Sequence, residues 1–222
     1  DFHFIHFGGL AHGGAGLIFS EMVCVSADGR ITPGCAGLYR PEHAAAWRRV
    51  IDAVHHQSDA RFAMQIGHAG RKGSTRVAWE GMDQPLAEGN WPLIAPSAIP
   101  FYSFSHTPRE MTPDDMDRVT EEFVAAARMA ADAGADMLEL HMAHGYLLSS
   151  FITPVSNRRG DEYGGSLDNR MRFPLAVFDA VRAVWPDEKP MSVRISATDW
   201  VGEAGVTGDE AVRIAGMLKD HG

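Results

Sequence analysis

The segment Met137–Tyr146, with the sequence MLELHMAHGY, is the feature that most constrains the fold. Apolar residues alternate with Glu139 and His141, and Gly145 then opens a turn, which is the pattern of a strand that runs into a loop. If a helix precedes it, the segment forms one β/α unit with polar groups at the carboxyl end of its strand. Barrels and doubly wound sheets place their chemistry at that end, so we expect the functional site here.

The rest of the chain repeats this alternation of strand and helix. Strands are predicted over 17–22, 61–67, 137–141 and 191–196, and helices over 41–57, 112–134, 166–185 and from 207 onward. Such an order predicts a parallel sheet with helices outside it. A (β/α)8 barrel needs eight strands. The predicted fold class is therefore α/β, a partial TIM barrel with about four of the eight strands, truncated at both ends.

We interpret residues 1–222 as a single partial barrel domain with a long excursion at 68–111. The excursion is irregular and rich in Gly, Pro and Trp, and a loop of this length in a compact domain is usually functional. Because it follows the predicted strand 61–67, it should lie over the site. Residues 147–166 are also predicted to be loop.

Composition excludes several classes of function. The net charge of −9 disfavours nucleic acid and anionic membranes as partners, and no apolar run is long enough to span a bilayer. Cys24 and Cys35 are too few for a zinc or iron–sulfur site. Two reduced thiols in a cytoplasmic protein are expected, with a single disulfide between them as the alternative.

Three predicted strands each carry a polar side chain near the carboxyl end, on the face opposite their apolar neighbours. These side chains are Gln65, His141 and Arg194. In a barrel the polar face points inward, so the three should meet at one cavity. An amide, an imidazole and a guanidinium suit a planar polar ligand with an anionic edge. The alternatives are that Gln65 bonds only to backbone and that Arg194 pairs only with Glu139.

The motif His141-x-x-His144 followed by Tyr146 permits several interpretations. Two imidazoles three residues apart are a weak metal signal without the H-E-x-x-H pattern. After a strand they can instead donate to one substrate oxygen, and this is the interpretation we adopt, with no metal. Tyr146 can deliver a proton, and the alternative is a buried tyrosine bonded to backbone.

Several longer motifs resemble those of the Old Yellow Enzyme family. They are the run HMAHGYLL from His141, FITP from Phe151, NRR from Asn157, DEYGGS from Asp161, NRMRF from Asn169, QIGHAGR from Gln65, APS from Ala95, REMT from Arg109 and VRIS from Val193. The resemblance covers nearly the whole chain. Within the family, the His-x-x-His form is similar to the bacterial ene-reductase branch. The runs 91–97 and 139–144 most resemble the reductase part of bifunctional aminobenzoyl-CoA or salicylyl-CoA monooxygenases.

The resemblance implies an FMN-containing barrel that takes hydride from NAD(P)H and passes it to the activated C=C bond of an α,β-unsaturated carbonyl compound. Gln65 then matches the ligand of the flavin pyrimidine edge, Arg194 the cation near N1 and O2, and Met22 the residue whose backbone approaches N5 and O4, where many relatives have Ala. The pair His141 and His144 matches the groups that bind and polarise the substrate carbonyl. Tyr146 matches the proton donor.

The same resemblance leaves alternatives. One is a reductase domain that acts on an aromatic acyl-CoA inside a bifunctional flavin monooxygenase, and another is a non-catalytic barrel fragment. The strands that hold the FMN phosphate in the family are not found in this sequence. We therefore expect the isolated chain to be poorly stable, with exposed sheet edges, and to bind FMN weakly. A small-molecule substrate is the expected partner, with homo-oligomer formation expected only of the full-length protein.

Overall fold

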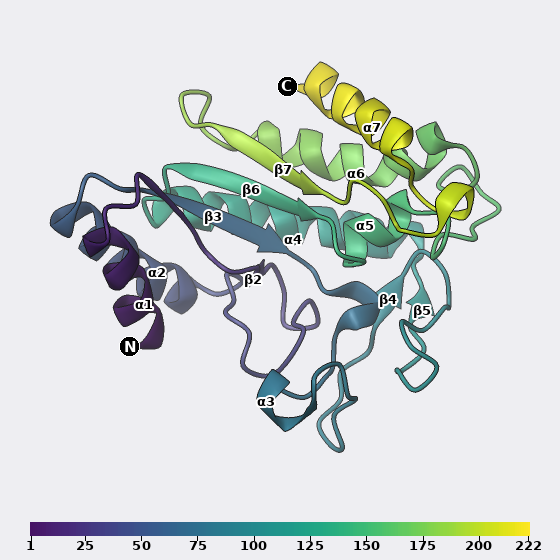
Figure 1. Cartoon of the computed structure of the whole chain (residues 1–222), viewed down its shortest axis with the longest axis horizontal. Coiled ribbons are helices and arrows are strands. Elements are labelled where there is room, and N and C mark those ends of the chain that lie inside the picture. Colours follow the sequence, from purple (N-terminus) through teal and green to yellow (C-terminus); the bar gives the residue numbers. More distant parts are fainter.

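The computed structural model describes residues 1–222 and has a twisted, curled sheet of parallel strands at its centre (Figure 1). The strand order is β1-β3-β6-β7, with bounds Leu17–Phe19, Arg61–Gly67, Met137–Met142 and Met191–Ile195. A short strand β2, Val23–Cys24, also pairs with β3. The predicted α/β class and the partial barrel are confirmed.

The first predicted strand is interrupted. Residue Phe19 of β1 pairs with Ala63, and Val23 of β2 pairs with Ile66, so one extra residue lies on the side of β1 and β2. Ser20 fills the break, because its hydroxyl accepts a hydrogen bond from the backbone N–H of Gln65 at 2.9 Å. An extra residue of this kind bends a strand and redirects side chains, as a β-bulge does. Here it precedes Met22.

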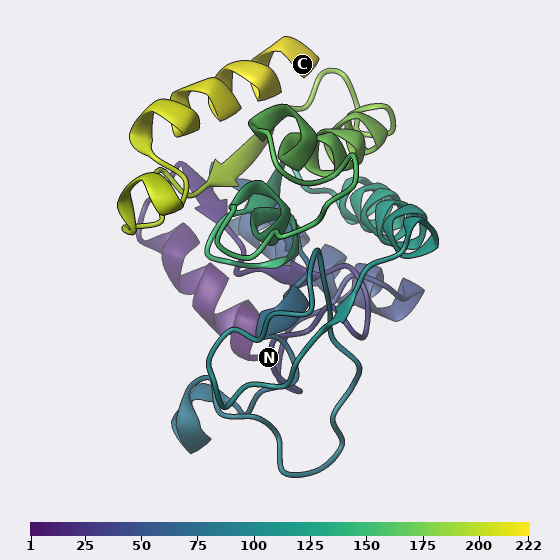
Figure 2. The same ribbon diagram turned by 90° about the vertical axis from the view of Figure 1, so that its right-hand side faces the viewer.

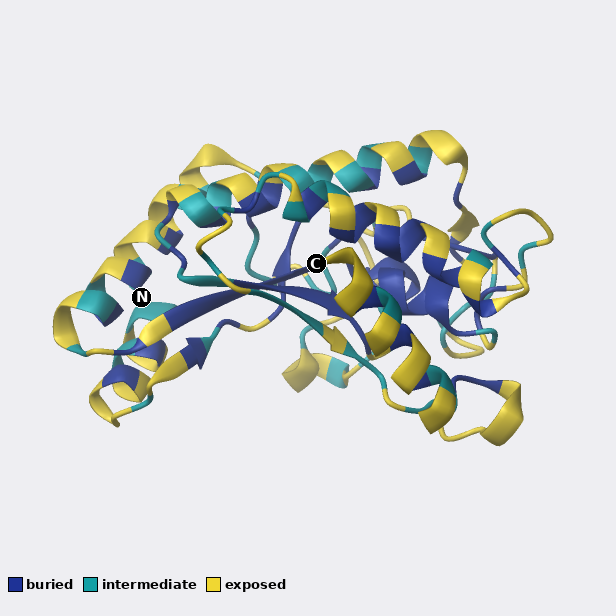
Figure 3. Cartoon of the chain, turned by 90° about the horizontal axis from the view of Figure 1, so that it is seen from above, coloured by how far each residue is buried: buried dark blue, intermediate teal, exposed yellow.

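Helices cover one face of the sheet. They are α2 (Pro41–Gln57), α4 (Pro113–Asp132) and α6 (Leu167–Arg182), with α7 (Gly208–His221) against α6 and α1 (Phe2–His12) against α2 (Figure 2). Their inner stripes are buried and their outer faces exposed (Figure 3), as amphipathic spacing predicts. Phe7 of α1 reaches the sheet and meets Phe62 edge to face at 5.1 Å. No helix combines the length and apolar character that a bilayer crossing requires.

The excursion at 68–111 contains short elements of its own. They are η1 (Gly70–Lys72), α3 (Ala78–Gly81), β4 (Ile94–Ala95) and β5 (Arg109–Glu110), and β4 pairs with β5 in parallel. Arg159 fastens the excursion to the body of the molecule, because its guanidinium donates to the carbonyls of Pro96 at 3.1 Å and Met111 at 2.8 Å. The excursion is therefore mostly irregular, as predicted, but hydrogen bonds fix its last part to the body of the molecule.

The prediction of loop over 147–166 is wrong for its first residues. They form helix α5, Leu147–Ile152, and all six of its side chains are buried. A helix that is buried on every side shows no 3.6-residue alternation of apolar and polar residues, so periodicity gives no signal for it. The short helix η2 (Gly202–Ala204) then lies between β7 and α7.

Capping positions define where the outer helices begin. Thr112 and Asp115 form a reciprocal capping box at α4. Thr207 caps α7 through the backbone of Glu210. The Glu210 carboxylate does not complete that second box, because it accepts a hydrogen bond from Arg170 at 2.7 Å. Glu210 therefore forms an ion pair between α6 and α7 instead of completing a capping box.

We expect Thr112→Ala to lower the free energy of unfolding by about 1 kcal/mol, because the first turn of α4 loses the acceptor for the backbone N–H of Asp115. Thr112→Ser keeps the hydroxyl and should restore most of the loss. Urea denaturation followed by circular dichroism measures both. Equal stability of the Ala and Ser variants would contradict a capping role.

Candidate functional site

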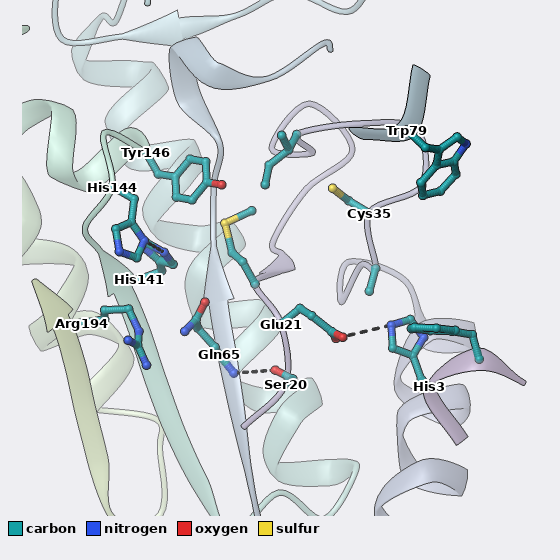
Figure 4. A pocket seen from close by; sticks show the side chains of 15 residues that line it. His3, Ser20, Glu21, Cys35, Gln65, Trp79, His141, His144, Tyr146 and Arg194 are labelled. Atoms are coloured by element: carbon teal, nitrogen blue, oxygen red, sulfur yellow. Dashed lines mark hydrogen bonds and ion pairs between the residues drawn. The ribbon is translucent and has the colours of Figure 1, made fainter. Parts of the chain in front are cut away.

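A cavity of about 810 Å³ opens at the carboxyl end of the central strands (Figure 4). All six side chains selected from the sequence border it: Met22, Gln65, His141, His144, Tyr146 and Arg194. Figure 4 labels five of them, all except Met22, and shows that they come from separate strands and loops, with His3 of α1 and Cys35 of the loop after β2 on the opposite wall. The predicted convergence on one cavity is therefore observed, while the role of each residue is a separate question.

The strand register brings these groups together. Gln65 of β3 lies beside Glu139 of β6, which lies beside Ser192 of β7, and two residues on His141 lies beside Arg194. Residues paired across parallel strands point to the same side of the sheet, and so do residues two apart. The polar groups of three strands therefore share one face, opposite the helices.

Glu139 joins the polar groups beneath the cavity. Its carboxylate is 6% exposed and accepts from the Gln65 amide nitrogen at 2.7 Å, the Arg194 Nε at 2.9 Å and the Ser192 hydroxyl at 3.3 Å. The alternative interpretation that Arg194 pairs with Glu139 is thus correct as far as Nε is concerned. The two Nη nitrogens of Arg194 and the Gln65 Oε1 make no hydrogen bond within the protein and remain available to a ligand.

His141 and His144 contact each other. The Nδ1 of His141 accepts from the backbone N–H of Ala143 at 3.2 Å, and its Nε2 lies 3.0 Å from the Nδ1 of His144. In a neutral pair these contacts put the His141 proton on Nε2, where it is donated to His144, and the His144 proton on its own Nε2. The pair therefore presents one free N–H donor. A second becomes available when a ligand oxygen replaces His144 as the acceptor.

Both imidazoles are held neutral at pH 7. Burial is the main cause that lowers the pKa of His141 to about 4, with further contributions from His144 and Arg194. Burial also lowers the pKa of His144, together with the positive charges of Arg194 and Lys72. Both rings are therefore hydrogen-bond donors without a positive charge of their own.

The turn after β6 holds His144 in an unusual conformation. Its φ is 60°, and Gly145 follows with φ 74°, so two successive residues lie in the left-handed region. Its backbone N–H donates to the Ser196 hydroxyl at 3.0 Å, and its carbonyl accepts from the Lys72 ammonium at 3.2 Å. A non-glycine residue in this region costs energy and is retained where surrounding contacts fix it.

Tyr146 follows directly and packs edge to face on the His141 ring, with centroids 4.9 Å apart. Burial raises the pKa of its phenol to about 12, so the hydroxyl keeps its proton at neutral pH. The hydroxyl has no hydrogen-bond partner within the protein and points into the cavity (Figure 4). The alternative of a tyrosine bonded to backbone does not describe this residue.

Met22 packs closely against β3. A Cβ on Gly67 would lie 2.8 Å from the Met22 sulfur and 3.2 Å from the His141 Cβ, so any larger residue here would require the Met22 side chain to move. Neither Gly67 nor Ser20 was selected from the sequence. Both are small residues whose role depends on the bulge after β1, which the strand pattern does not reveal.

The cavity wall also carries a thiol that sequence reasoning did not assign to the site. Cys35 lines the cavity, and its sulfur accepts from the backbone N–H of Thr32 at 3.3 Å. A hydrogen bond from Cys24 is the main cause that lowers the pKa of Cys35 to about 6, and the partner Cys24 has its pKa raised. Both cysteines are free thiols.

A second group of titratable residues lies away from the cavity. Asp28, His68 and Glu122 have ligand atoms within 4.8 Å of one another, a spacing that a metal ion could use. However, Arg118 is 3.3 Å from Asp28 and 2.6 Å from Glu122, and the His68 Nδ1 already accepts from Gly70 N–H. The Nδ1 lone pair of His68 is therefore already used in a hydrogen bond, and Arg118 supplies the positive charge that balances the two carboxylates. We interpret the group as a packing contact between α4 and the loops.

Comparison with known proteins agrees with this geometry. The model of the NADH:flavin oxidoreductase / NADH oxidase family matches residues 2–222. An NADPH dehydrogenase of Clostridium acetobutylicum is 39% identical over 221 residues, which are 99% of this chain and 61% of that protein. The chain spans about three fifths of the length of most curated relatives that it matches.

Two solved structures show the same fold. A 2-naphthoyl-CoA reductase in complex with 2-naphthoyl-CoA has a TM-score of 0.85 at 28% identity, over 99% of this chain and 33% of that chain. Old Yellow Enzyme from Pichia sp. AKU4542 has a TM-score of 0.76 at 28% identity, over 88% of this chain and 50% of that chain. Because the family model spans nearly all residues, this chain belongs to the NADH:flavin oxidoreductase / NADH oxidase family, as its resemblance to Old Yellow Enzyme predicts.

Proposed function

We propose that the protein containing this chain is an FMN-dependent oxidoreductase that moves hydride from NAD(P)H to the activated C=C bond of an α,β-unsaturated carbonyl compound. One observation carries the proposal. A free amide oxygen, a guanidinium with two free nitrogens, a pair of neutral histidines and a protonated phenol border one cavity in a member of this family. Such a set matches a planar redox ring with a carbonyl compound above it.

The free polar atoms fit the pyrimidine edge of a flavin. Gln65 offers an acceptor for a ring N–H, and the Nη nitrogens of Arg194 offer donors and a positive charge for neighbouring ring acceptors. Met22, after the bulge, lies on the same wall. When bound, FMN would supply hydride acceptance from NAD(P)H and hydride delivery to the alkene β-carbon. The protein supplies position and electrostatics.

The remaining residues act on the substrate. The free N–H of His144, and that of His141 once released, donate to the carbonyl oxygen, where negative charge grows as the β-carbon receives hydride. Because both rings are neutral, they stabilise this charge without giving up a full proton. The Tyr146 hydroxyl, kept protonated by burial, delivers a proton to the α-carbon.

A second candidate is reduction of an aromatic acyl-CoA thioester. It is favoured by the superposition with 2-naphthoyl-CoA reductase, at a TM-score of 0.85. The same histidine donors would serve the thioester oxygen. Whether the chain belongs to a bifunctional monooxygenase stays a prediction, as does the non-catalytic alternative.

The first experiment follows flavin absorbance near its visible maximum. When the protein that contains this chain has been titrated with FMN, we expect NAD(P)H to bleach the absorbance and an enone such as 2-cyclohexen-1-one to restore it without oxygen. Restoration by an aromatic acyl-CoA but not by the enone would favour the second candidate. Absence of bleaching with FMN bound would support the non-catalytic alternative.

Substitution of Tyr146 tests the proton donor. We expect Tyr146→Phe to slow reoxidation of the reduced flavin by the enone by about 10²–10⁴-fold relative to bleaching by NAD(P)H, because only the alkene step uses the phenol proton. Stopped-flow absorbance separates the two steps. Tyr39→Phe, a change of the same kind outside the cavity, is the control, and an equal effect on both steps would refute the assignment.

The neutral state of His141 gives a pH dependence of stability. Its folded pKa of about 4 lies below the ordinary value of 6.5, so the unfolded chain takes up a proton first as the pH falls. The contribution of neutral His141 to the free energy of unfolding is therefore fully present above about pH 6.5 and is lost as the pH falls toward 4. Protonation of this residue should lower the free energy of unfolding by an amount on the order of 2 kcal/mol between pH 7 and pH 5. We expect His141→Gln to lack this part of the pH dependence, as measured by urea denaturation. The exposed His56→Gln is the control and should leave the pH dependence unchanged.

A further inference from the structure

Arg71 is a buried cation without a carboxylate partner. Two arginines are buried, and the other, Arg170, pairs with Glu210 at 2.7 Å. Arg71 is 8% exposed and has no carboxylate within ion-pair distance. Its Nη1 makes only long bonds, to the carbonyls of Ile99 at 3.4 Å and Pro100 at 3.3 Å, and its buried Nε has no acceptor. A buried charge left in this way costs free energy that an anion would offset.

The next residue, Lys72, is a second cation without a carboxylate partner. Its ammonium donates to the His144 carbonyl at 3.2 Å and lies 4.3 Å from the centre of the Phe101 ring and 5.2 Å from that of Tyr146. The Arg71 guanidinium lies 5.4 Å from the same Phe101 ring. One aromatic ring thus holds both cations in place. Burial lowers the pKa of each, and the charge of Arg71 lowers that of Lys72 further while the charge of Asp83 opposes the shift.

Arg71 borders space that adjoins the proposed reaction site. Arg71, Phe101 and His144 line a second cavity of about 510 Å³, with the hydroxyl groups of Ser196 and Thr198. Its one carboxylate, Asp199, already accepts from the Thr153 hydroxyl at 2.5 Å and the Val206 N–H at 2.7 Å. Arg71 and Lys72 also border a small hollow of about 10 Å³ beside it, together with Asp83 and His106. Asp83 is not within ion-pair distance of either cation, although its negative charge acts to raise the pKa of Lys72.

We propose that Arg71 and Lys72 form an oxyanion-binding subsite, which holds a carboxylate or phosphate of a ligand whose reacting part lies against His144 and Tyr146. The inference rests on the proposed function and names the class of substrate, an activated alkene that carries an anionic group. A planar guanidinium and an ammonium on one aromatic ring are the donors that carboxylate and phosphate require. The same chemistry could come from the 2′-phosphate of NADPH, so the test has two arms.

The first arm compares trans-3-benzoylacrylate with its methyl ester, which lacks the charge. Binding to the FMN-loaded protein that contains this chain is measured by calorimetry without NAD(P)H, so that no alkene is reduced. In Arg71→Gln and in Lys72→Gln we expect the preference for the carboxylate over the ester to fall about tenfold or more. Lys72→Arg should restore most of it. Arg76→Gln, the same charge change at an exposed position of the same excursion, is the control.

The second arm compares NADPH with NADH as the reductant that bleaches the flavin in the same variants. A loss of preference in either arm supports the subsite and tells which molecule supplies the oxyanion. Unchanged preferences in both arms would overturn it, and would place carboxylate binding at the histidine pair. If Arg71→Gln fails to fold by circular dichroism, Lys72→Gln decides alone. A protein containing this chain that reduces neither compound refutes the proposed function, whereas one that reduces the ester yet shows no charge preference refutes only the subsite.

Discussion

The site depends on the register of three parallel strands. One row across β3, β6 and β7 consists of Gln65, Glu139 and Ser192. Two residues further along β6 and β7, His141 lies beside Arg194. A shift of one residue in any strand would turn its polar groups toward the helices and its apolar groups into the cavity. Burial of Met64, Leu138 and Leu140 on the helix side opposes such a shift. The packing that stabilises the sheet therefore also aligns the chemistry.

Within that register, Glu139 determines which polar atoms face the cavity, although it does not line the cavity itself. Because its carboxylate can only accept, the Gln65 amide must turn its nitrogen inward and its oxygen outward. Because Arg194 uses Nε on the same carboxylate, its Nη nitrogens face outward. A buried carboxylate with three donors is thus a positioning residue. Its removal would leave Gln65 free to reverse and Arg194 free to move.

Sequence reasoning found the four repeated units and the helices α2, α4, α6 and α7, because each depends on local pattern: alternation in a strand, 3.6-residue spacing in a helix, a cap at its start. The strand pattern also selected Gln65, His141 and Arg194, which border one cavity, whereas Met22 was selected only through the family resemblance. It missed features that depend on contacts between distant segments. The bulge after β1 is visible only in its pairing with β3, and α5 is buried on all sides and has no periodicity. The central role of Glu139 appeared only as an alternative pairing, because one sequence does not show how many donors a carboxylate will meet.

Charge distribution links the site to its proposed chemistry. The chain carries a net charge of −9, yet Arg194, Lys72 and Arg71 surround the histidine pair and only Glu139 lies directly beneath. Burial, with the charges of Arg194 and Lys72, lowers the pKa of both histidines, so the donors nearest the substrate are neutral and the positive charges lie behind them. Such an arrangement stabilises negative charge that develops on a ring or an oxygen without protonating it in the ground state. The same excess of positive charge that suits a hydride transfer would also draw an anionic substrate to the cavity.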